Sequence, residues 1–412
     1  MPWLCLLAAL PASCGPLITT GSTVLVAPQP ATASTRIPLL YGSERPLVAV
    51  SFLRADGGER RVLAWLNTGA AEPVLSKALY RELGLPEGRD LRMRIGATAI
   101  TVAGATVRDG PGDLDGQDLF ALLFAPRPVE AVLPASILSR FMVVIDPADR
   151  TLTLAAPGSL KPAGIPVPIR VDPASGIAVV EARTGEMVLP LVLDAGAPYT
   201  WLRSSAVAGV LRSHPEAYRA DGAVGSSNLA MADLGLERSG TLVRLPDLSL
   251  GGLVLSGVGA LGTGPVLGAA AEALVGEVFW DVWERAAPVP VAGWLGGNVL
   301  ADFKLTIDYA AGLSYWQRQR LGDLHDLDGI GVTLIRRGGD YVIGRVAERS
   351  GRRLVEGVEP GDQLVAVDGR ALRETPPEWV WAALHGRVGT IRHLDLARGG
   401  RPFRIEATAV PF

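Results

Sequence analysis

The strongest constraint on the fold of this chain is an internal repeat. Residues 62–71 (VLAWLNTGAA) return as residues 189–198 (LPLVLDAGAP), and residues 137–146 (ILSRFMVVID) return as residues 299–308 (VLADFKLTID). The two signatures occur in the same order in both copies. The second copy is longer, and its extra residues fall within 205–292. Two lobes of one design explain this pattern better than chance does.

Length and composition fit several turn-rich β domains. A chain of 412 residues is too long for one ordinary core. A hydrophobic fraction of 48% with 49 glycines suits folded β structure, whereas a net charge of -3 without a basic block excludes a nucleic-acid binder. The residue pattern predicts strands at 47–53, 95–103, 142–145 and 151–155, and short helices at 76–83 and 135–141.

Cysteine and histidine usage argues against metal and thiol chemistry. The only cysteines are Cys5 and Cys14, so the rest of the chain has no thiol nucleophile, disulfide or Cys-based metal site. The four histidines are scattered without metal-ligand spacing. We therefore expect no metal and no cofactor.

The first 36 residues are predicted to form a leader and a linker. Residues 1–15 are apolar, end in small residues and resemble an export signal, and Ala-Ser-Cys at 12–14 resembles a bacterial lipoprotein cleavage site. The alternative is an apolar N-terminal strand. Residues 22–36 are predicted to be a linker, and no later segment is apolar enough to cross a membrane. The expected location is secreted, periplasmic or lipid-anchored through Cys14 in the bacterial cell envelope.

The duplicated pattern resembles the retropepsin-like or pepsin-like aspartic protease family. There, each lobe has an apolar strand that runs into Asp-Thr-Gly or Asp-Ser-Gly, and later an apolar-apolar-Gly element ahead of a helix. Here the two loops are Leu-Asn-Thr-Gly-Ala at 66–70 and Leu-Asp-Ala-Gly-Ala at 193–197. The later element is Trp-Leu-Gly at 294–296 and is degraded to Leu-Pro-Ala at 133–135.

The resemblance covers residues 37 to 320 and implies two mostly β, barrel-like lobes that form one cleft. Lobe 1 is assigned to 37–160 and lobe 2 to 161–320. Because both lobes lie on one chain, a monomer suffices to complete the cleft. The expected partner is a peptide or protein bound as substrate or ligand.

The family's chemistry assigns roles to the two loops. Two carboxylates about 3 Å apart share one proton and act as base and acid for amide hydrolysis. The resemblance places Asp194 and Asn67 at these two catalytic positions, and Asn67 replaces the first carboxylate with an amide that cannot exchange the working proton. The active-site loops also include Thr68, Gly69, Ala195 and Gly196, and Ala195 removes one of the two interlobe hydroxyls.

Two hypotheses therefore remain open. In the first, the protein binds and hydrolyses extended peptides with Asp194 as the only retained catalytic carboxylate. In the second, it is an inactive scaffold, a pseudoprotease that holds peptides without cleaving them. Taken singly, each loop could also be an ordinary turn, and this is the role expected for Asp146 and Asp308, which follow the repeated second signature.

The last part of the chain resembles a PDZ domain over residues 325–412. Residues 358–369 (VEPGDQLVAVDG) resemble the bacterial PDZ signature, in which a Pro-Gly-Asp turn enters a strand that ends in Asp-Gly. The resemblance implies that the loop Gly329, Ile330, Gly331 and Val332 captures a peptide carboxylate. It also implies that the strand at 332–335 and a helix at 376–384 form the peptide groove. The alternative is a small α+β domain whose glycine loop has no special role.

Overall fold

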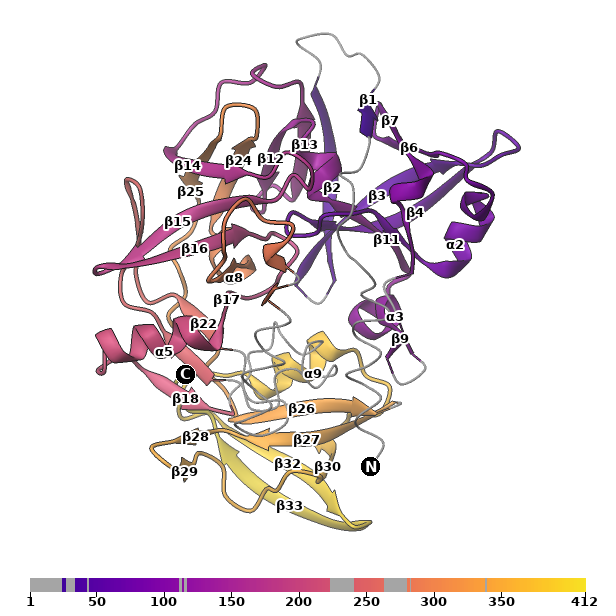
Figure 1. The fold of residues 1–412 in the computed structure, drawn as a ribbon. Coiled ribbons are helices and arrows are strands. Elements are labelled where there is room, and N and C mark those ends of the chain that lie inside the picture. The colour runs from indigo at the N-terminus through magenta and orange to yellow at the C-terminus, as the bar shows by residue number, and fades with distance from the viewer. Residues whose placement is uncertain are drawn as a thin grey trace.

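A computed structural model describes residues 24–26, 34–42, 44–110, 113–114, 117–222, 241–262, 280–281, 283–337 and 339–412. The predicted fold class is confirmed: two mostly β lobes are followed by a small α+β domain (Figure 1). Most of the predicted leader, including Cys14, lies outside the described residues. The linker prediction for 22–36 is wrong at two places, because Val24–Val26 pairs with Thr98–Val102 and Ser34–Gly42 is a full strand.

Lobe 1 is built from short strands around a buried apolar core. Its elements are β1 (Val24–Val26), β2 (Ser34–Gly42), β3 (Arg45–Leu53), β4 (Glu59–Asn67), β5 (Val74–Leu75), α2 (Lys77–Glu82), η1 (Leu85–Glu87), β6 (Leu91–Ile95), β7 (Thr98–Val102), η2 (Gly104–Thr106), β8 (Arg108–Asp109), β9 (Asp113–Leu114), β10 (Gln117–Asp118), α3 (Leu119–Phe124), β11 (Val129–Pro134), α4 (Ala135–Leu138), β12 (Met142–Asp146) and β13 (Thr151–Ala155).

Lobe 2 repeats the plan of lobe 1. Its elements are β14 (Ile165–Val171), β15 (Ala178–Thr184), β16 (Met187–Leu193), β17 (Trp201–Leu202), α5 (Ser204–Ser213), β18 (Arg219–Asp221), β19 (Thr241–Arg244), β20 (Leu248–Leu250), β21 (Leu253–Leu255), β22 (Gly259–Gly262), β23 (Gly293–Leu295), α8 (Gly297–Leu300), β24 (Phe303–Asp308) and β25 (Leu313–Arg318).

The repeated second signature joins the two lobes in one sheet. Its two copies, β12 and β24, pair with each other antiparallel, with Met142 opposite Asp308 and Ile145 opposite Leu305. Outward from this central pair, β13 and β2 follow on the lobe 1 side, and β25 and β14 follow on the lobe 2 side. Each lobe thus contributes equivalent strands to a shared antiparallel sheet, as the order of the repeats requires.

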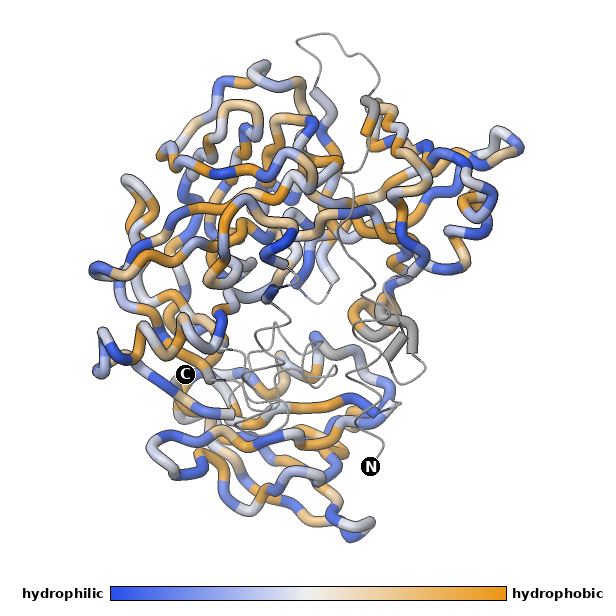
Figure 2. The backbone as a smooth tube through the Cα atoms, in the orientation of Figure 1, coloured by the Kyte–Doolittle hydropathy of each residue, from blue (hydrophilic) through white to orange (hydrophobic). Residues whose placement is uncertain are grey.

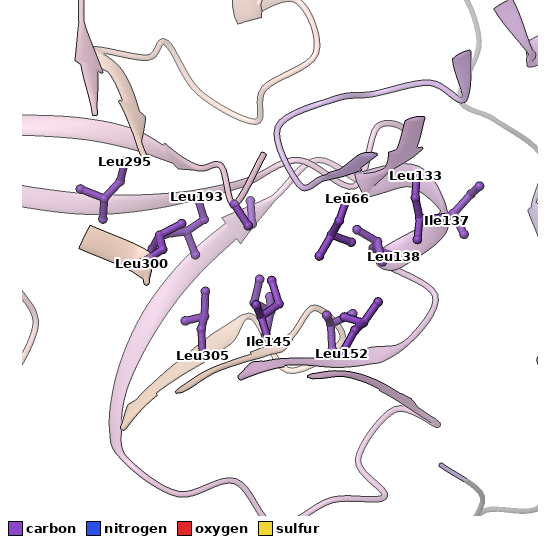
Figure 3. Packing of buried hydrophobic residues seen from close by; sticks show 14 of the residues in the cluster. Leu66, Leu133, Ile137, Leu138, Ile145, Leu152, Leu193, Leu295, Leu300 and Leu305 are labelled. Atoms are coloured by element: carbon purple, nitrogen blue, oxygen red, sulfur yellow. The ribbon is translucent and has the colours of Figure 1, made fainter. Parts of the chain in front are cut away.

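Repeat-related leucines fill the space between this sheet and the two predicted active-site loops. Leu66 and Leu193, each directly before the polar residue of its loop, are fully buried. Figure 3 shows them facing Ile145 and Leu305 of the shared sheet. Burial of apolar area stabilises a fold by about 25 cal/mol per Å². The packing of these leucines therefore holds both loops against the same shared sheet.

The C-terminal domain has its own hydrophobic core, which comprises residues from Ile330 to Ala409. Its elements are β26 (Val332–Arg337), β27 (Asp340–Val346), β28 (Glu348–Arg349), β29 (Arg352–Arg353), β30 (Gln363–Val367), β31 (Arg370–Ala371), α9 (Pro377–Leu384), β32 (Ile391–Arg398) and β33 (Arg401–Thr408). The predicted groove strand and groove helix correspond to β26 and α9, and prolines at the helix start suit its first turn.

This domain packs against lobe 2 through strand pairing and hydrogen bonds. Glu348 of β28 pairs with Asp221 of β18. The Tyr218 hydroxyl and the Arg349 guanidinium both donate to the carbonyl of Pro411, at 2.9 and 2.7 Å. The sequence contains no local signal for this contact.

The short elements predicted in the lobes are confirmed with changed bounds, and the strand predicted over 95–103 is shortened to Thr98–Val102, because residues 96–97 form the turn between β6 and β7. Ser76 caps α2, since its hydroxyl accepts from the N–H of Leu79. Asp146 and Asp308 each accept from a backbone N–H three residues later, which confirms their expected turn role. Figure 2 shows hydrophobic residues along the inner strands and hydrophilic residues at many of the outer loops. No described helix is long and apolar enough to cross a membrane.

Candidate functional site

Asn67 and Asp194 occupy equivalent places in the two lobes. Strand β4 ends at Asn67, and β16 ends one residue before Asp194. Each of these strands has a parallel neighbour, so that Leu66 lies opposite Leu133 in lobe 1 as Leu193 lies opposite Leu295 in lobe 2. The following short strands, β5 and β17, pair antiparallel with the same two neighbours. The repeat therefore produces the same looped topology twice.

Thr68 links the two loops directly. Its hydroxyl donates to the carbonyl of Leu193 at 2.6 Å and accepts from the N–H of Ala195 at 2.8 Å. The indole N–H of Trp65 adds a bond to the carbonyl of Gly196 at 3.2 Å. Ala195 has no hydroxyl with which to bond the lobe 1 loop in return. A hydroxyl therefore bonds the two loops from the lobe 1 side alone, through Thr68.

Two glycines allow the loops to approach closely. A Cβ at Gly69 would lie 2.5 Å from Oδ2 of Asp194, and a Cβ at Gly196 would lie 2.6 Å from Cγ of Asn67. Both distances are shorter than Cβ atoms tolerate. The side chains of Asn67 and Asp194 thus each reach the backbone of the opposite loop, at the centre of the contact between the lobes.

Burial governs the electrostatics of the Asp194 carboxyl group. Its side chain is 4% exposed, and its Oδ1 accepts from the N–H groups of Gly196 at 2.8 Å and Ala197 at 3.2 Å. Burial raises the pKa of Asp194 to about 6, although these N–H groups, the N–H of Gly69 and the positive charge of Arg45 oppose the shift. The Asn67 side chain, 5% exposed, accepts from the N–H of Gly69 at 2.9 Å.

The raised pKa predicts that Asp194 weakens the fold as pH rises. A folded-state pKa above the unfolded value of 3.8 means that the folded state binds more protons between about pH 4 and pH 6. Stability is therefore lost as pH rises through this window, by about 3 kcal/mol in total. Asp194→Asn should remove this loss. The free energy of unfolding of the variant minus that of the parent should therefore be about 2 kcal/mol larger at pH 7 than at pH 4.

Urea unfolding at both pH values measures this difference. Asp247→Asn, at an exposed position, controls for the change in net charge. Equal effects of Asp194→Asn at the two pH values would contradict the expected perturbation.

Arg45 and Trp65 belong to the site but were not among the predicted residues. The Arg45 side chain is 3% exposed, and its guanidinium lies 5.9 Å from the centroid of the Trp65 ring. Its charge lowers the pKa of Asp194. Trp65 lies within the first repeated segment, and this position was a sequence signal by which it could have been predicted as a site residue. An arginine at the start of an apolar strand has no comparable signal.

The predicted carboxylate-binding loop of the C-terminal domain is bonded within the chain. The N–H of Gly329 donates to Val410 at 3.1 Å, and the N–H of Ile330 donates to Leu384 at 2.9 Å. The N–H of Val332 donates to the carbonyl of Ile330 at 2.7 Å, and a Cβ at Gly331 would lie 3.0 Å from the Phe412 ring. The cavity at this loop measures only about 20 Å³.

A much larger cavity lies beside the loop of Asp194. It measures about 710 Å³, within the range of ligand pockets, and Ala195 is part of its wall. Lobe 1 contributes Tyr41 and Pro46, lobe 2 contributes Pro198 and Leu300, and the connection to the C-terminal domain contributes Leu321. We call it the interlobe cavity. Among the described residues, no group of three or more His, Cys, Asp or Glu side chains could hold a metal ion.

Comparison with known proteins shows distant structural similarity. No family model and no curated protein sequence matches this chain. The aspartic proteinase from Irpex lacteus is 13% identical over 70% of this chain and 98% of its own length, with a TM-score of 0.37. Conglutin gamma, a basic 7S globulin from lupine seeds, is 10% identical over 71% of this chain and 96% of its own length, with a TM-score of 0.39.

A further similarity covers a smaller part of the chain. The photosystem II D1 C-terminal processing protease is 23% identical over 21% of this chain and 23% of its own length, with a TM-score of 0.19. Because all these TM-scores are low, the assignment of a two-lobe, pepsin-like fold with a C-terminal α+β domain rests on the strand pairing described above.

Proposed function

We propose that this protein binds extended polypeptide segments in the interlobe cavity and that its aspartic-protease-type site is disarmed at Asn67. The observation that carries the proposal is that Asn67 and Asp194 each lie against the backbone glycine of the opposite loop, Gly196 and Gly69, while Thr68 bonds the two loops together. The binding geometry is thus retained, and one of the two carboxylates is missing.

The chemistry of the pair explains why hydrolysis is expected to be slow. A carboxylate dyad shares one proton between a base and an acid, whereas an amide neither accepts nor releases that proton. Loss of one acid–base partner lowers the rate by about 10² to 10⁴. Binding of a peptide in the cavity does not require Asp194 to ionise.

Photo-crosslinking from the cavity wall tests the proposal. A benzoylphenylalanine at Leu321, which lines the cavity and is 84% exposed, should capture members of an unstructured peptide library added to the full chain. The same residue at Val254, also exposed and outside the cavity wall, is the control. Equal labelling at the two positions would contradict binding in the cavity.

The C-terminal domain is proposed to recognise no free peptide carboxylate in this arrangement. The N–H groups of Gly329 and Ile330 donate to carbonyls of the chain itself, and the Phe412 ring lies against Gly331. Peptides with a free or an amidated C-terminus should therefore bind the full chain with affinities within about twofold of each other. Fluorescence anisotropy measures this, and a tenfold preference for the free carboxylate would show that the loop acts as in other PDZ domains.

A second candidate function is slow hydrolysis by Asp194 alone. It is favoured by the burial of this carboxyl group, which raises its pKa to about 6, close to the pH at which a single acid–base group works best. Its rate should then depend on one essential carboxylate and vanish in Asp194→Ala. A bell-shaped pH profile in the acid range would contradict this candidate.

The proposed location is the bacterial cell envelope, reached through the leader and with Cys14 as a lipid attachment site. Metabolic labelling with a fatty acid in the native host tests it. Label lost in Cys14→Ser would support the anchor, and equal label in both chains would contradict it.

A further inference from the structure

The wall of the interlobe cavity carries more acidic than basic groups. Five carboxylates and two guanidiniums line it, from Glu44, Asp302, Asp323, Asp326, Glu378, Arg127 and Arg320. These carboxylates come from the β2–β3 turn of lobe 1, from lobe 2, from the segment after β25, and from α9. They converge on one space only because the three parts of the chain pack together.

Some of these carboxylates are neutralised by the protein and others are not. Asp326 pairs with Arg244 at 2.6 Å, and Asp302 pairs with Arg320 at 3.5 Å. Within the described part of the chain, Glu44 and Glu378 have no ion-pair partner. Both side chains are exposed to the cavity and its solvent, where a ligand can reach them.

The acidic groups act on one another across the cavity. Loss of hydration beside the surrounding protein raises the pKa of Glu44, the neighbouring Arg45 opposes this increase, and the negative charge of Asp326 adds to it. Burial raises the pKa of Asp302, the charges of Arg320 and Arg318 oppose this increase, and the charges of Asp323 and Asp326 add to it. A cation that enters the cavity would be attracted by the charges of Glu44 and Glu378, which have no ion-pair partner among the described residues.

We propose that the interlobe cavity selects polypeptides with a basic side chain, lysine or arginine, which lies between Glu44 and Glu378 while the backbone passes Ala195. The inference rests on the proposed function, since it names the class of peptide bound at that same site. Charge complementarity with the wall, the volume of about 710 Å³ and the contact of the cavity with the Asp194 loop support it.

Three pools of labelled decapeptides test the inference with the full chain. Each pool has a fixed central lysine, norleucine or glutamate, and the other positions are randomised without lysine or arginine. At low salt the lysine pool should be retained about tenfold better than the norleucine pool, and the glutamate pool least. The lysine preference should fall in about 0.5 M salt, because screening weakens exposed charge pairs.

Matched variants assign the preference to the cavity. The double variant Glu44→Gln, Glu378→Gln should reduce the lysine preference to about threefold or less. Glu186→Gln, an exposed glutamate outside the cavity wall, should leave it unchanged. A lysine-to-norleucine ratio within twofold, or a ratio that the double variant does not change, would overturn the inference.

Loss of the charge preference and loss of peptide binding give different results in this experiment. If the parent retains all pools equally well, peptide binding stands and the charge selection is refuted. If no pool is retained at all, the proposed function fails together with the inference that depends on it.

Discussion

Asn67→Asp should convert this protein into an acid peptidase. A carboxylate at position 67 would lie opposite Asp194, in loops that Thr68 already holds together, and would restore the second acid–base partner. Aspartate has the size of asparagine, and the N–H of Gly69 that now donates to Asn67 can donate to the carboxylate. The rate of peptide hydrolysis should rise by about 10² to 10⁴ relative to the parent.

The pH dependence of the new activity should differ from that of the parent. Two buried carboxylates so close together cannot both ionise, so they titrate as a pair with two apparent pKa values. The rate of Asn67→Asp should therefore follow a bell in the acid range. Cleavage of a mixed peptide library, followed by mass spectrometry from pH 3 to pH 8, measures both the rate and its profile.

The double variant Asn67→Asp, Asp194→Asn is the matched control. It keeps one carboxylate and one amide but exchanges their lobes, so its rate should return to the level of the parent. If Asn67→Asp is folded and binds peptides but hydrolyses them as slowly as the parent at every pH, bound peptide bonds do not lie next to the two carboxylates. The cavity would then be a peptide-binding site without a catalytic role.

The sequence predicted the fold well where a duplicated pattern was available. Two copies of an apolar strand before a polar-small-Gly loop predicted equivalent loops, and two copies of the second signature now pair as β12 and β24 in the shared sheet. Such patterns can be read from the sequence because alternation along a strand and the choice of turn residues depend only on neighbouring residues. The strand and the helix predicted near 332–335 and 376–384 in the C-terminal domain are confirmed for the same reason.

Other features depend on contacts between segments far apart in sequence. Arg45 acts on Asp194 across the lobes, and Phe412 packs against Gly331 while Arg244 of lobe 2 donates to its carbonyl. No local period or motif encodes such contacts, because each partner alone is an ordinary strand, loop or terminal residue. The cavity and its excess of carboxylates likewise exist only after three parts of the chain have packed.

Thr68→Val should destabilise the contact between the two lobes more than any other change of similar size at the site. Valine matches the shape of threonine but lacks the hydroxyl that bonds both Leu193 and Ala195. Both backbone groups lie in buried residues, so each loses its bond without access to water. A buried polar group left unsatisfied costs about 1 to 3 kcal/mol, so the expected loss for the two groups is about 2 to 6 kcal/mol.

Thr68→Ser separates the hydroxyl from the methyl group. Serine keeps both hydrogen bonds and removes one methyl, so its cost should stay near 1 kcal/mol. Urea unfolding followed by tryptophan fluorescence should report the two variants well, because Trp65 of lobe 1 and Trp201 and Trp294 of lobe 2 lie close to the loops. The valine variant should also unfold in two separate steps, since Ala195 carries no hydroxyl that could maintain the link. Equal stability of the valine and serine variants would instead mean that the shared sheet around β12 and β24 alone holds the lobes together.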